Sequence, residues 1–219
     1  MSLLPGHGDG DGVSAGLAAS AILSKGTTEQ KERWALELLT LEKVGAWAIT
    51  EAGSGSDAFG GMRSSARREG DEFVLNGSKT FITNGPYADT TVFICKLEEE
   101  GVDPRDRKIL NFVLERGLPG FEQTAPLRKM GMHSSPTGEL FLTDVRIGMD
   151  RLLGGQEALA KKGGGREGAK STFQTERSGV AAMALGMVDR CLELSLSYAR
   201  ERVQFERPIG EYQLRAPTS

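Results

Sequence analysis

The strongest constraint on the fold is a long stretch of helical periodicity close to the end of the chain. From about Thr172 to Arg202, apolar side chains recur every three or four residues, which is the period of an amphipathic helix. The residues that would share the apolar side are Val180, Met183, Ala184, Met187, Val188, Cys191 and Leu194. A single helix at a terminus cannot bury such a stripe by itself. We therefore expect partner helices, either in residues outside this chain or in another subunit.

The residues before this helix have the alternation and the turn residues of a β-domain. Candidate strands lie at 91–96, 109–115 and 140–147, and the run "DEFVLNGSKTFITNG" holds two more on either side of Asn76-Gly77. Asn and Gly both tolerate a positive φ, so this pair predicts the tight turn of a hairpin. The pattern as a whole predicts an antiparallel, barrel-like β-domain.

Helical patterns also precede the β-domain. Small apolar residues at 13–24 permit a buried helix, and "GTTEQKERWALELL" predicts a second helix at about 28–39, which begins with a capping box of Thr27 and Gln30. The glycine-rich residues 154–171 predict a flexible connection to the last helix. The expected fold class is α+β, with an antiparallel β-barrel-like middle domain flanked by helices from incomplete N- and C-terminal helical domains. The three domains are expected at residues 1–43, 44–150 and 151–219.

Composition excludes several classes of protein. The net charge is −3 and no basic stripe is present, so nucleic acid is not an expected partner. No apolar run approaches the roughly 20 residues that span a bilayer, and the first residues lack the basic start of a signal peptide, so no membrane association is expected. Cys95 and Cys191 lie far apart and are expected to be core thiols in a reducing, cytoplasmic setting. Two histidines and no closely spaced cysteines predict no metal site.

Three short segments are candidates for a binding site. In "WAITEAGSGSD" (residues 47–57) an apolar run meets small polar residues, whose free N–H groups could bind anionic oxygens, with the hydroxyls of Thr50 and Ser56 as further donors. An ordinary loop before a strand would look the same, and the segment lacks the spacing of the dinucleotide fingerprint. In "KTFITNG", strand alternation would place Phe81 and Thr83 on one face. That pair suits a flat heteroaromatic ligand with polar edges, or a core phenylalanine beside a surface threonine.

The third segment, "RERVQFERPIGEYQ", could equally be a solvated basic helix end, where arginine is favoured by the helix dipole. Taken together and in this order, the three segments resemble those of the acyl-CoA dehydrogenase family. "RKMGMHSSPTGELFLTDVRI" is also similar to the stretch that closes the family's middle β-domain, and "ERSGVAAMALGMVDRCLELSLSYA" to the first helix of its C-terminal domain. The resemblance covers nearly the whole chain.

The resemblance implies FAD as the cofactor and assigns roles to individual positions. The FAD-binding residues it implies are Trp47, Ala48, Ile49, Thr50, Ser56, Phe81, Ile82 and Thr83, together with Arg202, Phe205 and Gln213, which in the family reach the FAD of a neighbouring subunit. Ser56 and Arg177 would contact the acyl-CoA thioester and its CoA arm. The implied partners are an acyl-CoA substrate, an electron-transfer flavoprotein that reoxidises the flavin, and further copies of the chain in a homo-oligomer.

The implied reaction is α,β-dehydrogenation of an acyl-CoA. A carboxylate removes an α-proton and a hydride leaves the β-carbon for the flavin, while hydrogen bonds to the thioester oxygen stabilise the developing enolate. In most of the family the base comes from late in the C-terminal domain, but a minority place it just before an arginine at the start of the first helix there. Glu176 has that position, although a first-turn glutamate favoured by the helix dipole would look the same. Glu206 stands where the family usually has glycine.

Two other functions fit the same residues. The chain could be a non-catalytic fragment or interaction module that keeps the β-domain without turnover. It could also be a related flavin oxidase, such as an acyl-CoA oxidase or a nitroalkane oxidase, which keeps the fold and differs in its oxygen access and base. Flavin content would separate the first alternative from the enzyme, and oxygen consumption during turnover would separate the second.

Overall fold

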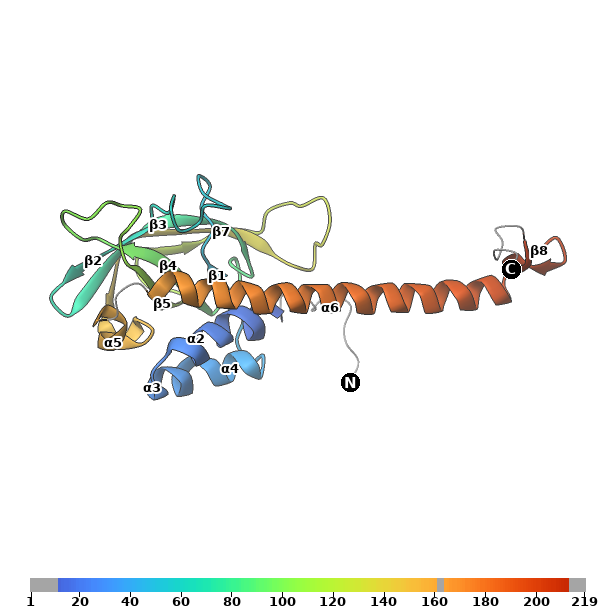
Figure 1. The fold of residues 1–219 in the computed structure, drawn as a ribbon, viewed down its shortest axis with the longest axis horizontal. Coiled ribbons are helices and arrows are strands. Elements are labelled where there is room, and N and C mark those ends of the chain that lie inside the picture. Colours follow the sequence, from blue (N-terminus) through green and yellow to red (C-terminus); the bar gives the residue numbers. More distant parts are fainter. Residues whose placement is uncertain (1–11, 161–163, 213–219) are drawn as a thin grey trace. The chain divides into compact units, whose positions relative to one another are not determined.

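The computed structural model describes residues 12–160 and 164–212 of the chain, and for residues 12, 13, 15 and 164–176 it describes the backbone alone. The chain divides into two compact units, Met1–Thr172 and Phe173–Ser219. The first unit holds a β-sheet with short helices beside it, and the second holds most of one long helix and a small hairpin (Figure 1). Within these described residues, no helix is both long enough and apolar enough to cross a bilayer.

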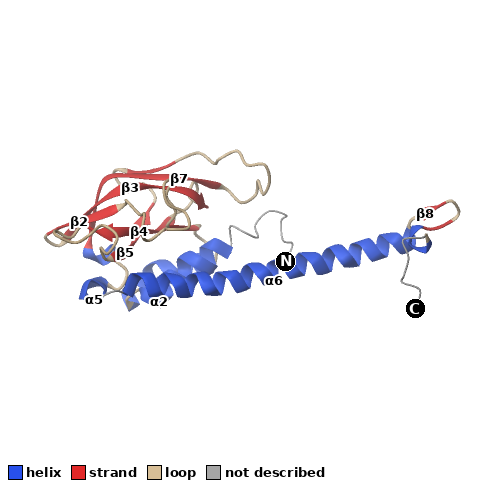
Figure 2. Cartoon of the chain, turned by 45° about the horizontal axis from the view of Figure 1, so that its top comes forward, coloured by secondary structure: helices blue, strands red, loops and turns tan. Residues whose placement is uncertain are grey.

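The sheet of the first unit is mixed and curls into a half-barrel (Figure 2). Its strands are β1 (Gly45–Ala48), β2 (Ser65–Glu69), β3 (Glu72–Thr83), β4 (Thr90–Leu97), β5 (Ile109–Glu115), β6 (Phe121–Gln123) and β7 (Thr137–Gly148). They follow the order β1-β4-β2-β3-β7-β6, and β5 pairs with the other edge of β4. Most pairs are antiparallel as expected, and the strands expected at 91–96, 109–115 and 140–147 are present. However, β4 runs parallel to both β1 and β2, which the sequence did not predict.

The hairpin predicted at Asn76-Gly77 is wrong. β3 runs straight through both residues and is only bulged between Leu75 and Gly77. The hairpin turn lies earlier, at Gly70-Asp71, where Gly70 has a φ of +65° and Glu69 pairs with Glu72. Gly77 is needed for a different reason, because a Cβ atom there would lie 2.7 Å from Cα of Ser64. In this chain, the Asn-Gly pair therefore marks a β-bulge that packs closely against Ser64, the residue before β2.

Alternating side chains of β3, β4, β5 and β7 form the core of the half-barrel. Phe73 and Phe112 meet there edge to face, with their ring centroids 5.0 Å apart. Cys95 on β4 is buried among them as expected, and burial raises the pKa of its thiol to about 12. The other fully buried large apolar side chains of the sheet are Leu75, Phe93, Ile94, Leu114 and Leu140.

The N-terminal helices pack against the sheet beside β1 (Figure 1). They are the π-helical η1 (Gly12–Ala19), α2 (Ser20–Lys25), α3 (Thr28–Gln30), the π-helical η2 (Lys31–Ala35) and α4 (Leu36–Leu39). The predicted capping box of Thr27 and Gln30 is confirmed. Gln30 also joins the helices to the residues that follow β7. Its Nε2 donates to the carbonyls of Asp150 and Leu152 at 2.7 Å each, and its Oε1 accepts from the amide of Gly154 at 3.1 Å.

The segment expected as a flexible connection is more regular than predicted. After η3 (Met149–Arg151) come helix α5 (Gly155–Ala160) and, from residue 164, the first turns of helix α6 (Gly164–Glu201). The 38 residues of α6 confirm the long helix of the sequence analysis. The chain then forms a two-stranded hairpin of β8 (Val203–Gln204) and β9 (Arg207–Pro208), followed by η4 (Ile209–Glu211).

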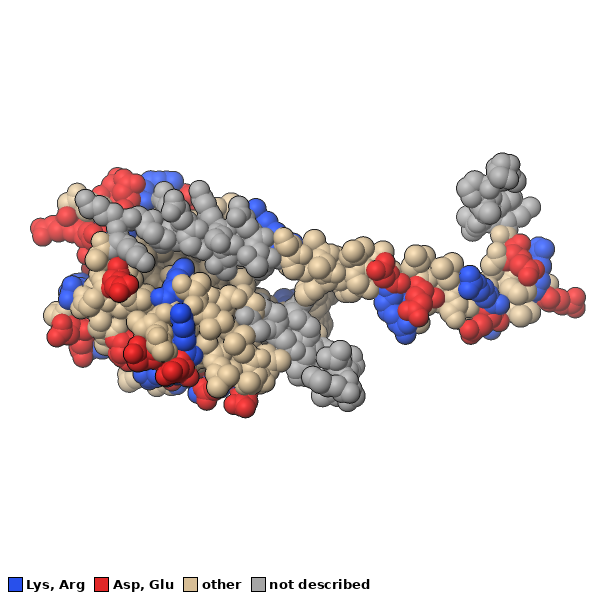
Figure 3. All heavy atoms as spheres, turned by 60° about the horizontal axis from the view of Figure 1, so that its bottom comes forward, with Lys and Arg blue, Asp and Glu red and all other residues tan. Residues whose placement is uncertain are grey.

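The apolar side chains of α6 are exposed, as expected for a helix without its partners. The exposed residues are Val180, Met183, Leu185, Met187, Val188, Leu192, Leu194, Leu196 and Tyr198. No charged residue occurs at positions 178–188, and the charged side chains gather further along the helix (Figure 3). Cys191 is exposed as well, so among the residues that the structure describes the prediction of a core thiol is wrong.

Candidate functional site

The first two candidate segments are directly joined in the structure. Trp47 and Ala48 end strand β1, and the chain continues through Ile49 and Thr50 beside strand β3. The amide of Thr80 donates to the carbonyl of Thr50 at 2.9 Å, and Nζ of Lys79 donates to the carbonyl of Ile49 at 3.0 Å. Residues 49–50 are therefore hydrogen-bonded to residues 79–80, which directly precede the "FIT" run of 81–83.

The same two segments are joined by a buried ion pair, Glu51–Lys79, that sequence reasoning missed. Nζ of Lys79 is 2.8 Å from Oε1 of Glu51, and both side chains are at least nine-tenths buried. The carboxylate of Glu51 also accepts from the amide and hydroxyl of Ser64, at 3.0 and 2.6 Å, and from the amide of Arg63 at 2.7 Å. The one sequence signal for the pair is a lysine inside an otherwise apolar and hydroxylated strand, together with an acid that directly follows β1.

Burial and the contacts of the pair shift the pKa values of both side chains. Burial opposes ionisation of Glu51, but the ammonium of Lys79 and the hydrogen bonds from Ser64 and Arg63 outweigh it and hold the pKa of the carboxyl below its usual value. Burial lowers the pKa of Lys79, and Glu51 offsets part of that effect. The ring of Phe93 adds a cation–π contact 5.2 Å from Nζ.

The glycines of the loop at 52–57 are not required by the fold. A Cβ atom added at Gly53 or Gly55 would meet nothing within 4 Å, and neither residue has a left-handed φ. The loop is fixed instead by Ser54, which forms a bridge with Glu51 and whose hydroxyl donates to the carbonyl of Asp57 at 2.5 Å. Gly53 and Gly55, which the loop does not need, leave room for another molecule to approach the backbone.

The "FIT" run has an unusual backbone. Phe81 has a φ of +56°, in the left-handed region that a bulky residue rarely adopts, and its side chain is 67% exposed. Ile82 is buried and Thr83 is half-buried, so exposure alternates along the strand as predicted. A strained residue that turns an aromatic ring outward is typical of functional sites.

An open pocket of about 460 Å³ adjoins Ser56. It is lined by Ser56, Asp57, Phe59, Gly60, Asp103, Arg105 and Asp106. Arg105 is engaged by Asp57 at 2.9 Å, so the pocket is mainly acidic. An acidic wall repels phosphate groups, and we therefore do not place a nucleotide in it. Among the described residues, no group of three or more His, Cys, Asp or Glu side chains is arranged to hold a metal ion.

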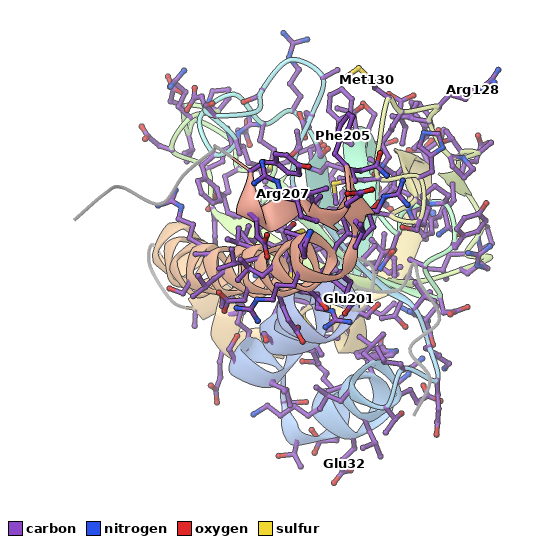
Figure 4. The ribbon with its side chains drawn as sticks, turned by 90° about the vertical axis from the view of Figure 1, so that its right-hand side faces the viewer. Glu32, Arg128, Met130, Glu201, Phe205 and Arg207 are labelled. Atoms are coloured by element: carbon purple, nitrogen blue, oxygen red, sulfur yellow. The ribbon has the colours of Figure 1, made fainter. Side chains whose placement is uncertain are left out.

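The hairpin after α6 carries the third candidate segment. Phe205 and Glu206 form its turn with φ values of +49° and +66°, and the phenylalanine ring is 89% exposed. Both Phe205 and Arg207 project from this hairpin (Figure 4). The hydroxyl of Tyr212 donates to the carbonyl of Gln204 at 2.8 Å and the guanidinium of Arg207 lies 4.0 Å from the tyrosine ring, which steadies the turn. Glu206 has a left-handed backbone conformation, which glycine adopts without strain, and this explains why the family usually has glycine at this position.

The remaining predicted residues all belong to the second unit; they are Glu176, Arg177, Arg202 and Gln213. Arg177 and Arg202 are exposed on and after α6. The backbone of Glu176 is part of α6, but its side chain lies outside the described residues, as does the whole of Gln213. Their predicted roles therefore stay predictions.

The fold combines a curled mixed sheet, in which two polar segments are hydrogen-bonded to each other, with one long helix. The family model "Acyl-CoA dehydrogenase, middle domain" matches residues 46–145, and "Acyl-CoA dehydrogenase, C-terminal domain" matches residues 163–216. The chain belongs to the acyl-CoA dehydrogenase family.

Individual relatives agree with this assignment. The short-chain specific acyl-CoA dehydrogenase of Megasphaera elsdenii is 35% identical over 201 residues, which are 92% of this chain and 50% of that protein. The crystal structure of an acyl-CoA dehydrogenase from Geobacillus kaustophilus has a TM-score of 0.82 at 35% identity, over 94% of this chain and 52% of the other. A glutaryl-CoA dehydrogenase from Mycobacterium smegmatis, solved in complex with FADH2, has a TM-score of 0.76 at 31% identity, over 92% and 48%. The chain thus spans about half the length of the relatives it matches.

The residues of the first unit fit the family's cofactor. FAD is the cofactor of the family, and the relative from Mycobacterium smegmatis holds its reduced form. In this chain a ligand can approach the backbone at Gly53 and Gly55 without displacing a neighbour. The exposed ring of Phe81 and the half-buried hydroxyl of Thr83 offer a flat apolar surface with a polar edge, as a flavin ring requires.

Proposed function

We propose that this chain forms the flavin-binding part of an enzyme that dehydrogenates an acyl-CoA thioester at its α and β carbons. The observation that carries the proposal is the direct hydrogen bonding between the two predicted flavin segments, from the amide of Thr80 to the carbonyl of Thr50. Family membership supports the reaction class, because the relatives it matches along half their length are named acyl-CoA dehydrogenases.

In this proposal each segment has a separate task. The backbone of 47–50 and the hydroxyls of Thr50 and Ser56 hold FAD, and Phe81, Ile82 and Thr83 lie along its ring. When bound, FAD supplies the acceptor for the hydride that leaves the β-carbon. Arg202, Phe205 and Gln213 reach the FAD of a neighbouring copy, as the family pattern implies.

The substrate is held and deprotonated by other residues of the chain. Ser56 contacts the thioester, where its donor favours the negative charge that develops on the thioester oxygen as the α-proton leaves, and Arg177 contacts the CoA arm. We assign the removal of the α-proton to Glu176. A carboxylate outside this chain is the alternative base. A carboxylate in a site closed to water has a raised pKa and so is a stronger base.

The proposed partners follow from the same reaction. An acyl-CoA is the substrate, an electron-transfer flavoprotein takes up the electrons, and a second copy of the chain covers the exposed stripe of α6. Cys95 and Cys191 are both unpaired, which fits a reducing compartment, and we propose the cytoplasm.

The test begins with the visible absorption spectrum of the purified chain after incubation with FAD. We expect flavin bands at about one FAD per chain, and bleaching of those bands when saturated acyl-CoAs of graded length are added without oxygen. Glu176→Gln should bind FAD and stop the bleaching, while Glu157→Gln on α5 should not affect it. A chain that stays colourless would refute flavin binding and favour the non-catalytic module. Bleaching that survives Glu176→Gln would move the base elsewhere, and rapid oxygen consumption would favour an oxidase.

A further inference from the structure

The buried Glu51–Lys79 pair connects the two segments to which we assign FAD. Lys79 lies on β3, two residues before Phe81, and its Nζ donates to Oε1 of Glu51 and to the carbonyl of Ile49, which both belong to the loop that follows β1. We propose that Glu51 and Lys79 are positioning residues, which set the spacing between the loop at 49–57 and the strand segment at 79–83. This inference rests on the proposed function, because it assigns a purpose to the pair at the same site.

The backbone of β3 is irregular between the pair and the outward ring of Phe81. The register of β3 against β7 shifts between Lys79 and Ile82, so this part of the strand is irregular. Consecutive residues Lys79 and Thr80 are therefore both buried, whereas regular alternation would expose one of them. The left-handed φ of Phe81 then returns the strand to its alternation with the ring facing outward. Release of Lys79 from Glu51 would let this bulge relax and move the ring.

The other end of the pair controls the loop. The four hydrogen bonds to the Glu51 carboxylate come from Arg63, Ser64 and Lys79, so they tie the start of the loop to the residues that lead into β2. Ser64 also packs where a Cβ atom on Gly77 would lie. One carboxylate thereby fixes both ends of the loop that carries Gly53 and Gly55.

Stability alone does not account for such a pair. A buried ion pair can often be replaced by apolar residues of similar volume with little loss of stability, although removal of one partner alone leaves a buried charge and is strongly destabilising. The double variant Glu51→Leu with Lys79→Met therefore separates the two roles. It removes both charges and all the positioning hydrogen bonds together and leaves no charge unpaired.

The experiment compares the double variant with the parent chain and with a matched control. The control is Arg151→Leu with Glu115→Leu, which removes another ion pair of the first unit, with a separation of 2.7 Å, that contacts neither segment. Thermal unfolding and far-ultraviolet circular dichroism establish the fold of each protein. Quenching of flavin fluorescence gives the Kd for FAD, visible circular dichroism reports the setting of the bound ring, and hydrogen exchange is followed at residues 49–64 and 79–83.

We expect the double variant to fold and to bind FAD about 10- to 100-fold more weakly, since residues that orient a site typically change affinity by that factor. Its exchange should rise at 49–64 and 79–83, and the visible circular dichroism of its flavin should change, while the control keeps the parent's values. If the Kd of the double variant for FAD lies within about twofold of the parent's Kd, the inference is overturned. If the parent itself binds no FAD, the proposed function fails, and exchange decides the inference. Faster exchange confined to both segments supports a positioning role, and unchanged exchange overturns it.

Discussion

Replacement of Gln30 tests how the N-terminal helices are held on the half-barrel. The Gln30 side chain is buried and makes four hydrogen bonds to backbone groups. Nε2 donates to the carbonyls of Asp150 and Leu152, and Oε1 accepts from the amides of Thr27 and Gly154. Gln30→Ala removes all four bonds and leaves these backbone groups inside a contact between elements that are distant in sequence.

The size of the effect follows from this count. Each hydrogen bond contributes about 1 kcal/mol net, and a buried group left without a partner costs about 1–3 kcal/mol. Water can reach the partly exposed Thr27, so three of the four groups remain unpaired, and at the low end of that cost, about 1 kcal/mol each, Gln30→Ala should lower the free energy of unfolding by at least about 3 kcal/mol. For a unit of this size that corresponds to a fall in Tm of about 10 °C.

An isosteric variant gives the sharper test. Gln30→Glu would place a carboxylate against the two carbonyl oxygens that now accept from Nε2, so burial and repulsion raise its pKa above the unfolded value. A raised pKa means that the variant is relatively most stable in acid and loses stability as the pH rises through that pKa. Urea unfolding followed by the fluorescence of Trp34 and Trp47 at several pH values measures both variants, with exposed Gln156→Ala as the control. A loss below about 1 kcal/mol for Gln30→Ala, the contribution of a single bond, or a pH slope of Gln30→Glu equal to that of the parent, would refute the reasoning.

Three further outcomes are expected. Gly77→Ala should destabilise the half-barrel by about 1–3 kcal/mol through overpacking, whereas Gly70→Ala, with φ of +65° and open space around it, should cost about 1–2 kcal/mol of backbone strain alone; a urea midpoint equal to the parent's for either variant would contradict this. Ellman's reagent should label Cys95 only on unfolding, because the thiol is buried and burial raises its pKa to about 12, and rapid labelling of two thiols would contradict it. Folding lowers the pKa of Glu51, so this carboxylate stabilises the fold above its unfolded pKa of about 4.3, and that stabilisation is lost as the pH falls further. The free energy of unfolding of Glu51→Gln should therefore fall less steeply in an acid titration than that of the parent.

Signals that lie within a few residues predicted structure well. The capping box of Thr27 and Gln30 was readable because the two residues bond to each other three positions apart. The strands at 90–97 and 109–115 were readable because their apolar runs are short and bounded by turn residues. The same reasoning failed at Asn76-Gly77, where the local signal fits a turn and a bulge equally, and the contact with Ser64 from a preceding segment decides between them.

The candidate site divides in the same way. The segments at 47–57 and 79–83 were identified from their own residue types, but their hydrogen bond from Thr80 to Thr50 depends on how β1 lies beside β3. The Glu51–Lys79 pair joins residues 28 positions apart and has no periodic signature. Parallel pairing of β4 with β1 and β2 is equally nonlocal, because nothing in a strand's own sequence states which neighbour it will have.

Glycines show what the structure adds to a sequence signal for a ligand. In the sequence, Gly53, Gly55 and Gly77 are alike, since each is a small residue in or beside a β-strand. In the structure, Gly77 is required, because a Cβ atom would lie 2.5 Å from Cβ of Ser64, whereas Gly53 and Gly55 have ordinary backbone angles and open space. Glycine costs conformational entropy wherever the fold does not need it. Two such residues on a loop that is fixed by the buried Glu51 are therefore better explained by a molecule that approaches the backbone there than by the requirements of the loop itself.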